Sequence, residues 1–350
     1  MRHFRSAASL ATTLLLLSGC TTAPRYAVPV SSAPAAFVGS GAVEERSAGA
    51  EQADLVTWWR GFHDPLLTSF VERALAQNLD LQQAGARVAQ ARAALKTANA
   101  ALLPSGQVNG QAGEIYQSLE TPIGRIGSAF PQFERATETY ELNVGASWEL
   151  DVFGGRDAAR DAARADWQAS AAAAVAVRLA VAAQTADTYI AIRALQARLG
   201  VARAQADTQA RLVDLIALQY RKGVAAELQL RQAEGALAQV RASVLAIQNQ
   251  LDKALTALDI LIGVQPGATR SEFTVVTTIP SPPAIATAGG PASLLRRRPD
   301  IIAAERTLAA SSARIGVAMS EYYPKFSLSG LLGTATTAAG GLFGGNATQA

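Results

Sequence analysis

Thirteen residues from Tyr140 to Val152 alternate strictly between apolar and non-apolar side chains. The apolar positions are Tyr140, Leu142, Val144, Ala146, Trp148, Leu150 and Val152, and the positions between them are Glu141, Asn143, Gly145, Ser147, Glu149 and Asp151. A period of two over this length predicts a β-strand with one apolar face and one wet face. At ~3.3 Å per residue the strand would reach ~43 Å, and a tilted strand needs only about 9 to 11 residues to cross a bilayer.

The two faces of this strand predict two environments. On the apolar face, we expect the following side chains to face lipid: Tyr140, Leu142, Val144, Trp148 and Leu150. On the other face, we expect these side chains to line a water-filled lumen: Glu141, Asn143, Ser147, Glu149 and Asp151. The alternative, that Glu149 and Asp151 form a functional carboxylate pair, explains the pattern less simply than exposure of both residues to a water-filled lumen.

Helix-forming residues dominate after the turn at Gly154 and Gly155. No proline occurs between Pro131 and Pro266, and Gly200 is the only glycine from Arg156 to Lys222. An unbroken helix over this range would be ~100 Å long at 1.5 Å per residue. A membrane-length strand that leads into so long a helix indicates a duct.

The end of this helix is marked by a tip sequence, Tyr220, Arg221, Lys222, Gly223, Val224 and Ala225. Basic residues in a last turn followed by Gly are typical of a helix end. A second helix is predicted from about Glu227 to Leu261, which completes a long hairpin over residues 156–262. Spacings such as Ile192/Leu195/Leu199 and Leu212/Leu215/Leu218 indicate a coiled-coil seam, with a plain antiparallel bundle as the alternative.

The N-terminus reads as a targeting segment. Residues 1–19 have a basic start and an apolar stretch, and Leu17-Ser18-Gly19-Cys20 looks like a bacterial lipoprotein signal. We therefore predict that Cys20 is lipidated after removal of residues 1–19; an ordinary secretory signal with an incidental cysteine is the alternative. Residues 20–57 are expected to form a lipidated, extended tether. Thr21 follows the cysteine, and the absence of Asp there favours the outer membrane.

Composition excludes several classes of function. Removal of residues 1–19 deletes two arginines and no acid, so the net charge falls from +3 to +1 and predicts no nucleic-acid partner. Cys20 is the only cysteine and His63 the only histidine beyond the signal peptide, so a zinc or copper site and a Ser/His/Asp constellation have no support. We expect no catalytic residues, no metal and no cofactor other than the lipid. No stretch approaches ~18 consecutive apolar residues, so any membrane crossing should use strands.

An internal repeat organises the rest of the chain. Asp80 to Pro104 and Asp300 to Pro324 have the same spacing at an offset of 220. The first window follows a helix that starts at Asp64-Pro65 and breaks near Asn78, and it precedes a second candidate strand at 106–116. The predicted parts are a first repeat over 58–265, an irregular linker over 266–298, and an incomplete second repeat over 299–350 with a strand at about 325–334. A full second repeat would need a further strong strand and hairpin, so we expect that the sequence is truncated.

Three or four strands cannot close a membrane barrel. An open strand edge leaves amides without partners in lipid, and the smallest single-chain barrels use about eight strands. We therefore predict a mainly α protein with membrane β structure, in which several copies share one transmembrane β-barrel and long helices extend it as a coiled-coil tunnel.

The chain resembles the TolC-type outer-membrane efflux proteins, in the NodT-like lipoprotein branch that serves resistance–nodulation–division pumps. The resemblance rests on Leu17-Ser18-Gly19-Cys20, Trp58-Trp59-Arg60-Gly61-Phe62-His63-Asp64-Pro65, Asn78-Leu79-Asp80, Ala86-Arg87-Val88-Ala89-Gln90-Ala91-Arg92, Leu102-Leu103-Pro104, Trp148-Glu149-Leu150-Asp151-Val152-Phe153-Gly154, Tyr220-Arg221-Lys222-Gly223 and Leu294-Leu295-Arg296-Arg297-Arg298-Pro299-Asp300.

The resemblance implies a homotrimer that does no chemistry. Each subunit would give four strands to one barrel in the outer-membrane lipid and helices to a tunnel in the periplasm. A periplasmic adaptor protein would contact the hairpin tip, Tyr220 to Ala225, and an inner-membrane pump would deliver drugs or other small molecules. A non-transporting coiled-coil lipoprotein of the envelope is the alternative from another class. A duct for metal ions or secreted proteins is the alternative cargo.

Overall fold

The computed structural model describes residues 24, 26–30, 34, 41, 56–282 and 290–350. The predicted signal peptide and Cys20 lie outside the described residues. Tertiary contacts divide the chain into two compact units, which we describe separately. Unit 1 comprises Met1–Val28, Gln90–Gln168 and Glu305–Ala350, and unit 2 comprises Pro29–Ala89 and Ala169–Ala304.

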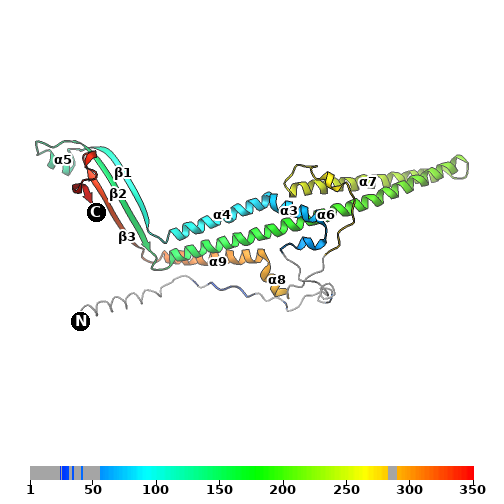
Figure 1. The fold of residues 1–350 in the computed structure, drawn as a ribbon, viewed down its shortest axis with the longest axis horizontal. Coiled ribbons are helices and arrows are strands. Elements are labelled where there is room, and N and C mark those ends of the chain that lie inside the picture. The colour runs from blue at the N-terminus through cyan, green and yellow to red at the C-terminus, as the bar shows by residue number, and fades with distance from the viewer. Residues whose placement is uncertain (1–23, 25, 31–33, 35–40, 42–55, 283–289) are drawn as a thin grey trace. The chain divides into compact units, whose positions relative to one another are not determined.

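Unit 1 contains an antiparallel sheet with the strand order β1-β2-β3-β4 (Figure 1). Its strands are β1 (Ser105–Tyr116), β2 (Ala136–Leu150), β3 (Phe326–Thr336) and the two-residue β4 (Thr348–Gln349). A short helix, α5 (Pro122–Gly127), lies in the connection between β1 and β2 and is capped at its start by the Thr121 hydroxyl. The three long strands match the three that the alternation predicts. The end of the central strand differs from the prediction, because β2 stops at Leu150.

The first helices begin where their capping residues predict. Asp64 Oδ1 accepts hydrogen bonds from the amides of Leu66 and Leu67, and α3 (Pro65–Gln77) follows with proline in its first turn. A short 3₁₀ helix, η2 (Trp58–Phe62), precedes it. The expected break falls at Asn78, whose side chain accepts from the amides of Asp80 and Leu81 and so starts α4 (Leu79–Ala100). One residue is thus the C-cap of α3 and, through its side chain, the N-terminal cap of α4.

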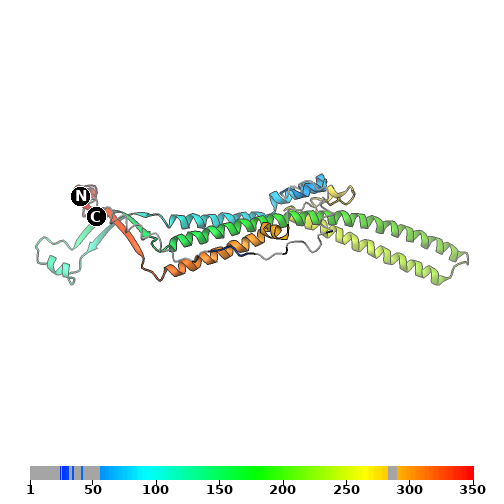
Figure 2. The ribbon, with the colours of Figure 1, turned by 90° about the horizontal axis from the view of Figure 1, so that it is seen from below.

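The predicted long hairpin is formed by α6 (Gly155–Arg221) and α7 (Glu227–Leu261). The first of these helices runs unbroken for 67 residues. Both views show α7 running back beside the C-terminal half of α6 (Figures 1 and 2). Beyond α7 come η3 (Arg270–Phe273), α8 (Pro291–Arg297) and α9 (Pro299–Ser320).

The apolar core of unit 2 brings α3 together with the middle of α6 and the end of α7. Its buried members include Trp59, Leu67, Phe70, Tyr189, Ile192, Leu199, Leu255, Leu258, Ile262 and Phe273. Arg73 pairs with Glu272 at 2.9 Å, and the Asn78 side-chain amide donates to the Leu261 carbonyl at 3.0 Å. These polar contacts connect α3 and its C-terminal end to the last residue of α7 and to η3.

The repeat windows have matching local structure. α4 and α9 each contain 22 residues, and their bounds differ by 220. β1 starts at Ser105 after α4, and β3 starts at Phe326 after α9. This agreement in element bounds supports an internal duplication, while the division into repeats and linker stays a prediction.

Among the described helices, α6 has the length and composition of a membrane-spanning helix. The length of its consecutive apolar runs did not predict this, because the average composition rather than any single run is apolar. Alanine-rich stretches such as 169–186 raise the average without long side chains. One such helix is weak evidence for a membrane span.

Candidate functional site

The register of the sheet places apolar side chains of neighbouring strands on the same face. Val144 pairs with Val108 on one side and with Leu332 on the other, and Trp148 pairs with Leu328. Leu150 pairs with Phe326 at the end of β2. The predicted apolar face of one strand therefore continues across all three long strands, as a lipid-facing surface requires.

The opposite face is polar across the same three strands. Asn143 pairs with Asn109, Glu141 with Gln111, and Ser147 with both Ser105 and Ser329. The sequence predictions assigned only the β2 residues to this face. The weaker alternations in β1 and β3 were the signal for its other polar residues, which are Ser105, Gln107, Asn109, Gln111, Ser327 and Ser329. Leu331 is an apolar exception on this face, opposite Gly145.

Aromatic residues bracket the apolar face. Trp148 lies near one end and donates its indole N–H to the Leu102 carbonyl at 2.9 Å. Tyr140 lies toward the other end, eight residues away on the same face. Eight residues of strand span ~26 Å, close to the apolar band of ~25 Å between the aromatic girdles of outer-membrane barrels.

Asp151 lies outside the strand to which the prediction assigned it. It lies after the end of β2, and its two carboxylate oxygens accept from the amides of Arg156 at 3.0 Å and Asp157 at 2.7 Å. A carboxylate at a helix N-terminus satisfies free amides and opposes the positive end of the helix dipole. The side chain therefore caps α6, which the alternating pattern did not predict, and its exposure to a lumen stays a prediction.

Glu149 ends the polar face and is paired rather than free. Its carboxylate accepts from the Arg156 guanidinium at 2.6 Å, and the same guanidinium donates to the Ala101 carbonyl at 2.6 Å. Arg156 thus connects the end of β2 to the end of α4. This junction fixes where the sheet gives way to helices within unit 1.

The predicted tip residues form a compact turn. Val224 N–H donates to the Gln219 carbonyl and Gly223 N–H to the Tyr220 carbonyl, both at 2.9 Å, which is the Schellman pattern of a helix end. Gly223 has a φ of 75°, where a residue with a Cβ is strained. α7 then begins with the Ala226 amide donating to the Gln229 side chain at 3.1 Å.

The tip exposes apolar and basic side chains together. Val224 is 76% and Tyr220 41% exposed, and Arg221 and Lys222 are exposed between them. Farther back on α6 the predicted seam is covered only in part. Ile192 and Leu199 are buried, but three seam leucines are 42–52% exposed in the single chain, namely Leu212, Leu215 and Leu218.

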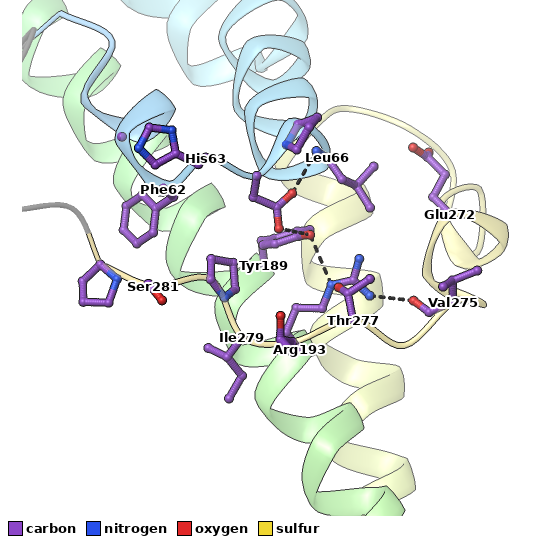
Figure 3. A pocket seen from close by; sticks show the side chains of 16 residues that line it. Phe62, His63, Leu66, Tyr189, Arg193, Glu272, Val275, Thr277, Ile279 and Ser281 are labelled. Carbon is purple, nitrogen blue, oxygen red and sulfur yellow. Dashed lines mark hydrogen bonds between the residues drawn. The ribbon is translucent and has the colours of Figure 1, made fainter.

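A cavity of about 940 Å³ lies in unit 2 beside the start of α3 (Figure 3). Tyr189 and Arg193 of α6 line it together with the segment around Val275. The Tyr189 hydroxyl donates to Asp64 Oδ2 at 2.8 Å and accepts from Arg193 Nε at 3.1 Å. Arg193 Nη1 also donates to the Gln196 side chain and the Val275 carbonyl, both at 2.9 Å.

This cluster holds a positive charge inside the protein. Arg193 is 2% exposed, and its guanidinium lies 5.0 Å from the Phe273 ring centroid and 5.2 Å from that of Tyr189. Burial raises the pKa of Tyr189 to about 12, and the hydrogen bond to Asp64 acts in the same direction. Sequence reasoning identified Asp64 as a cap and missed the cluster; a Tyr and an Arg four residues apart on one helix face were the available signal.

Among the described residues, no group of three or more His, Cys, Asp or Glu side chains could hold a metal ion. The residues described above form the two faces of a sheet and the contacts that hold the helices together. A two-faced sheet of membrane length, joined to long helices, is the fold expected for a subunit of the outer-membrane channels.

The chain belongs to the outer membrane efflux protein family, whose model matches residues 70–264. It is 32% identical to Nodulation protein T of Rhizobium leguminosarum bv. trifolii over 317 residues, which cover 90% of this chain and 64% of that protein. It is also 32% identical to the pyoverdine export outer membrane protein OpmQ of Pseudomonas aeruginosa, covering 96% of this chain and 69% of that protein. The solved structure of the outer-membrane channel OprN is similar at 30% identity and a TM-score of 0.78, covering 94% of this chain and 71% of that one.

The similarities confirm the fold class expected from the sequence. The chain has the fold of the outer-membrane efflux channels, in which strands form a membrane barrel and helices a tunnel. It spans 64% of the length of Nodulation protein T. The lipidation of Cys20, the assignment of the two strand faces to lipid and lumen, and the role of the hairpin tip stay predictions.

Proposed function

We propose that this chain is the outer-membrane channel component of a tripartite efflux system. It would conduct small molecules passively from an inner-membrane resistance–nodulation–division pump and a periplasmic adaptor to the exterior. The observation that carries the proposal is the two-faced sheet with open edges. Three long strands carry an apolar face of membrane height and a polar face suited to a water-filled lumen.

The open edge of β1 calls for further copies of the chain. In the described part of the chain, β1 pairs along its length with β2 alone. Each unpaired backbone group in lipid costs several kcal/mol, so a stable membrane sheet must close on itself. Three copies around one axis would supply enough strands to close a barrel, so we assign the protein as a homotrimer.

The helices support the same assembly. The seam leucines Leu212, Leu215 and Leu218 remain 42–52% exposed in one chain, although their spacing is that of a packed helix face. Neighbouring copies would cover this stripe in a tunnel of helices. The tip from Tyr220 to Ala225 would remain at the end of the tunnel, where it is the contact for the adaptor.

Cys20 would carry the lipid that anchors the N-terminus in the outer membrane. Its place after Leu17-Ser18-Gly19 supports this assignment. The cargo belongs to the small molecules that relatives are named for, such as the pyoverdine of the OpmQ protein. Pump and adaptor would select among them, because the polar face offers common wetting groups.

The test is the oligomeric state of the full-length gene product extracted from outer membranes in detergent. We expect a trimer whose β-sheet circular dichroism is lost on boiling, with a matching shift in gel migration. A purely helical monomer or dimer would overturn the shared barrel and favour an envelope spacer. Expression in a strain that lacks its own efflux channel should then restore resistance to exported compounds.

A further inference from the structure

The connection between β1 and β2 exposes apolar side chains at one end of the sheet in unit 1. Ile123 and Ile126 of α5 are 70% and 67% exposed, and Phe130, just after the helix, is 65% exposed. We call these three residues the apolar loop face. Single apolar side chains are normal on a protein surface, but a group of them within eight residues indicates an interaction.

The loop that carries this face has a defined internal structure. The Thr121 hydroxyl caps the start of α5 by accepting from a backbone amide at 3.2 Å, and it also accepts from the Gln117 side-chain amide at 2.6 Å. The Gln117 N–H donates to the Arg135 carbonyl at 2.7 Å, which closes the base of the loop. A Cβ atom on Gly127 would lie 2.4 Å from the Phe133 ring, so the chain packs closely there. The exposure of the apolar loop face is therefore a property of an ordered loop.

The apolar loop face lies beyond the predicted lipid-facing band. Tyr140 marks the end of that band on β2, and the strand extends four residues further, to Ala136 opposite Tyr116. Four residues are ~13 Å of strand, or ~9–11 Å in height at a tilt of about 35–45°. The headgroup layer of a bilayer is only about 5–8 Å thick on each side. Lipid tails therefore do not reach these side chains, and a protein surface is the environment that suits them.

Another exposed apolar side chain lies at the same end of the sheet. β3 runs antiparallel to β2, so its connection to β4 emerges at the end where β2 begins (Figure 1). Phe343 in this connection is 87% exposed. Because the apolar loop face and Phe343 are both exposed in the single chain, they do not cover each other within one copy.

The strand order places these two surfaces on opposite sides of the sheet. β1 is at one edge and β4 at the other. In a ring of copies related head to tail, opposite sides of successive subunits meet. Paired strands lie ~5 Å apart, so pairing of the open β1 edge with the next copy would bring the β1–β2 loop beside the β3–β4 connection of that copy.

We propose that the apolar loop face binds the β3–β4 connection of a neighbouring copy of this chain, with the partner subunit's Phe343 packed against Ile123 and Ile126. The inference rests on the shared barrel of the proposed function and adds a second contact between copies, outside the membrane. The contact would fix the register of the strand pair that joins two copies, because a shift along the strands would separate the two connections.

The first test is disulfide formation between differently tagged copies of the full-length protein. Ile126→Cys with one tag is co-expressed with Phe343→Cys carrying another, and outer membranes are oxidised and run on a denaturing gel. We expect a linked dimer that carries both tags. Arg125→Cys, exposed and adjacent in sequence, is the matched control for Ile126→Cys and should link at least about fivefold less, because a disulfide requires Cβ atoms within about 4.5 Å. The unaltered protein, whose only cysteine is Cys20, gives the background.

Three outcomes would overturn the inference, and they are distinguishable. A trimer that forms without the mixed disulfide would show that the loop does not contact the neighbouring connection. A disulfide between two Ile126→Cys chains in place of the mixed one would show that the loops of the copies meet one another instead. Absence of a trimer from the unaltered protein would overturn the shared barrel itself, and this contact with it.

The second test needs no introduced cysteine. Ile126→Ser should lower the temperature at which the trimer dissociates in detergent by about 3–10 °C, since it removes an apolar contact between copies. Arg125→Ser is the matched control and should leave this temperature within about 1 °C. Because Ile126 is exposed in one copy, the helical circular dichroism of the variant should equal that of the unaltered protein. An unchanged dissociation temperature for Ile126→Ser would overturn the contact.

Discussion

The Tyr189 hydroxyl donates to Asp64 Oδ2 at 2.8 Å, while Asp64 Oδ1 accepts from the first two free amides of α3. One carboxylate therefore both starts a helix and binds a second one, 125 residues later in the chain. Arg193, buried beside them, depends on the same hydroxyl as an acceptor. The cluster is the polar centre of unit 2.

Tyr189→Phe should destabilise unit 2 by about 1–3 kcal/mol, because it leaves the Arg193 Nε–H and Asp64 Oδ2 without their shared partner in a buried site. Urea unfolding followed by helical circular dichroism measures the effect. Tyr220→Phe at the exposed tip is the matched control and should stay within about 0.5 kcal/mol. Equal losses at both positions would contradict the role of the cluster.

Stability should fall steeply with alkaline pH in a way that depends on Tyr189. Its folded pKa of about 12 lies above the ordinary value of 10.0, so the folded state retains a proton that the unfolded state releases. The contribution is complete below pH 10 and is lost as the pH rises through 12, about 2–3 kcal/mol in all. Unfolding midpoints of the natural protein and of Tyr189→Phe should differ below pH 10 and converge by pH 12.

Val144→Arg should cost about 2–4 kcal/mol, since it places a charge at the centre of the apolar face between Val108 and Leu332. Asn143→Arg, one residue away on the polar face, should be much milder. The yield of folded, heat-modifiable trimer in outer membranes reports both. Similar losses would contradict the assignment of the lipid and lumen faces.

Two glycine substitutions distinguish the cost of backbone strain from the cost of fitting a Cβ atom into the available space. Gly223 and Gly235 both have open space where a Cβ would be added, but only Gly223 has a positive φ, 75°. Gly223→Ala should therefore cost about 1–2 kcal/mol locally, whereas Gly235→Ala inside α7 should gain about 0.5–1 kcal/mol. Amide hydrogen exchange of residues 218–226 and of α7 gives the two values; faster exchange in both variants would refute the strain argument.

Cys20→Ala should abolish incorporation of labelled palmitate and weaken retention at the membrane, while the trimer still forms through the strands. Fractionation and detergent gel migration measure these properties separately. A variant that still incorporates palmitate would remove Cys20 as the lipid site. Loss of the trimer would show that the anchor is needed for assembly.

Periodicity and capping residues predicted the elements well. The strict alternation located β2, the proline-free run located α6, and Asp64, Asn78 and Gly223 marked helix boundaries where the structure has them. These signals are local, because each arises from the backbone geometry of a few consecutive residues.

Tertiary relationships were the part that the sequence did not predict. Asp151 continued the alternation and yet caps α6, since a carboxylate next to a helix start finds free amides. The pairing of Tyr189 with Asp64, and of Tyr26 with Glu305, joins residues far apart in sequence with no periodic pattern to mark them. Likewise, the spacing of Leu212, Leu215 and Leu218 did not predict that these side chains are exposed in the single chain.

In the proposed shared barrel, the open edge of β1 would make protein concentration a thermodynamic variable for this chain. A strand that finds its partner only in another copy contributes little to the stability of a lone copy. By mass action, the free energy of the folded membrane form must then rise or fall with the number of copies in the same patch of membrane. Low expression should therefore lower the folded fraction as well as the amount.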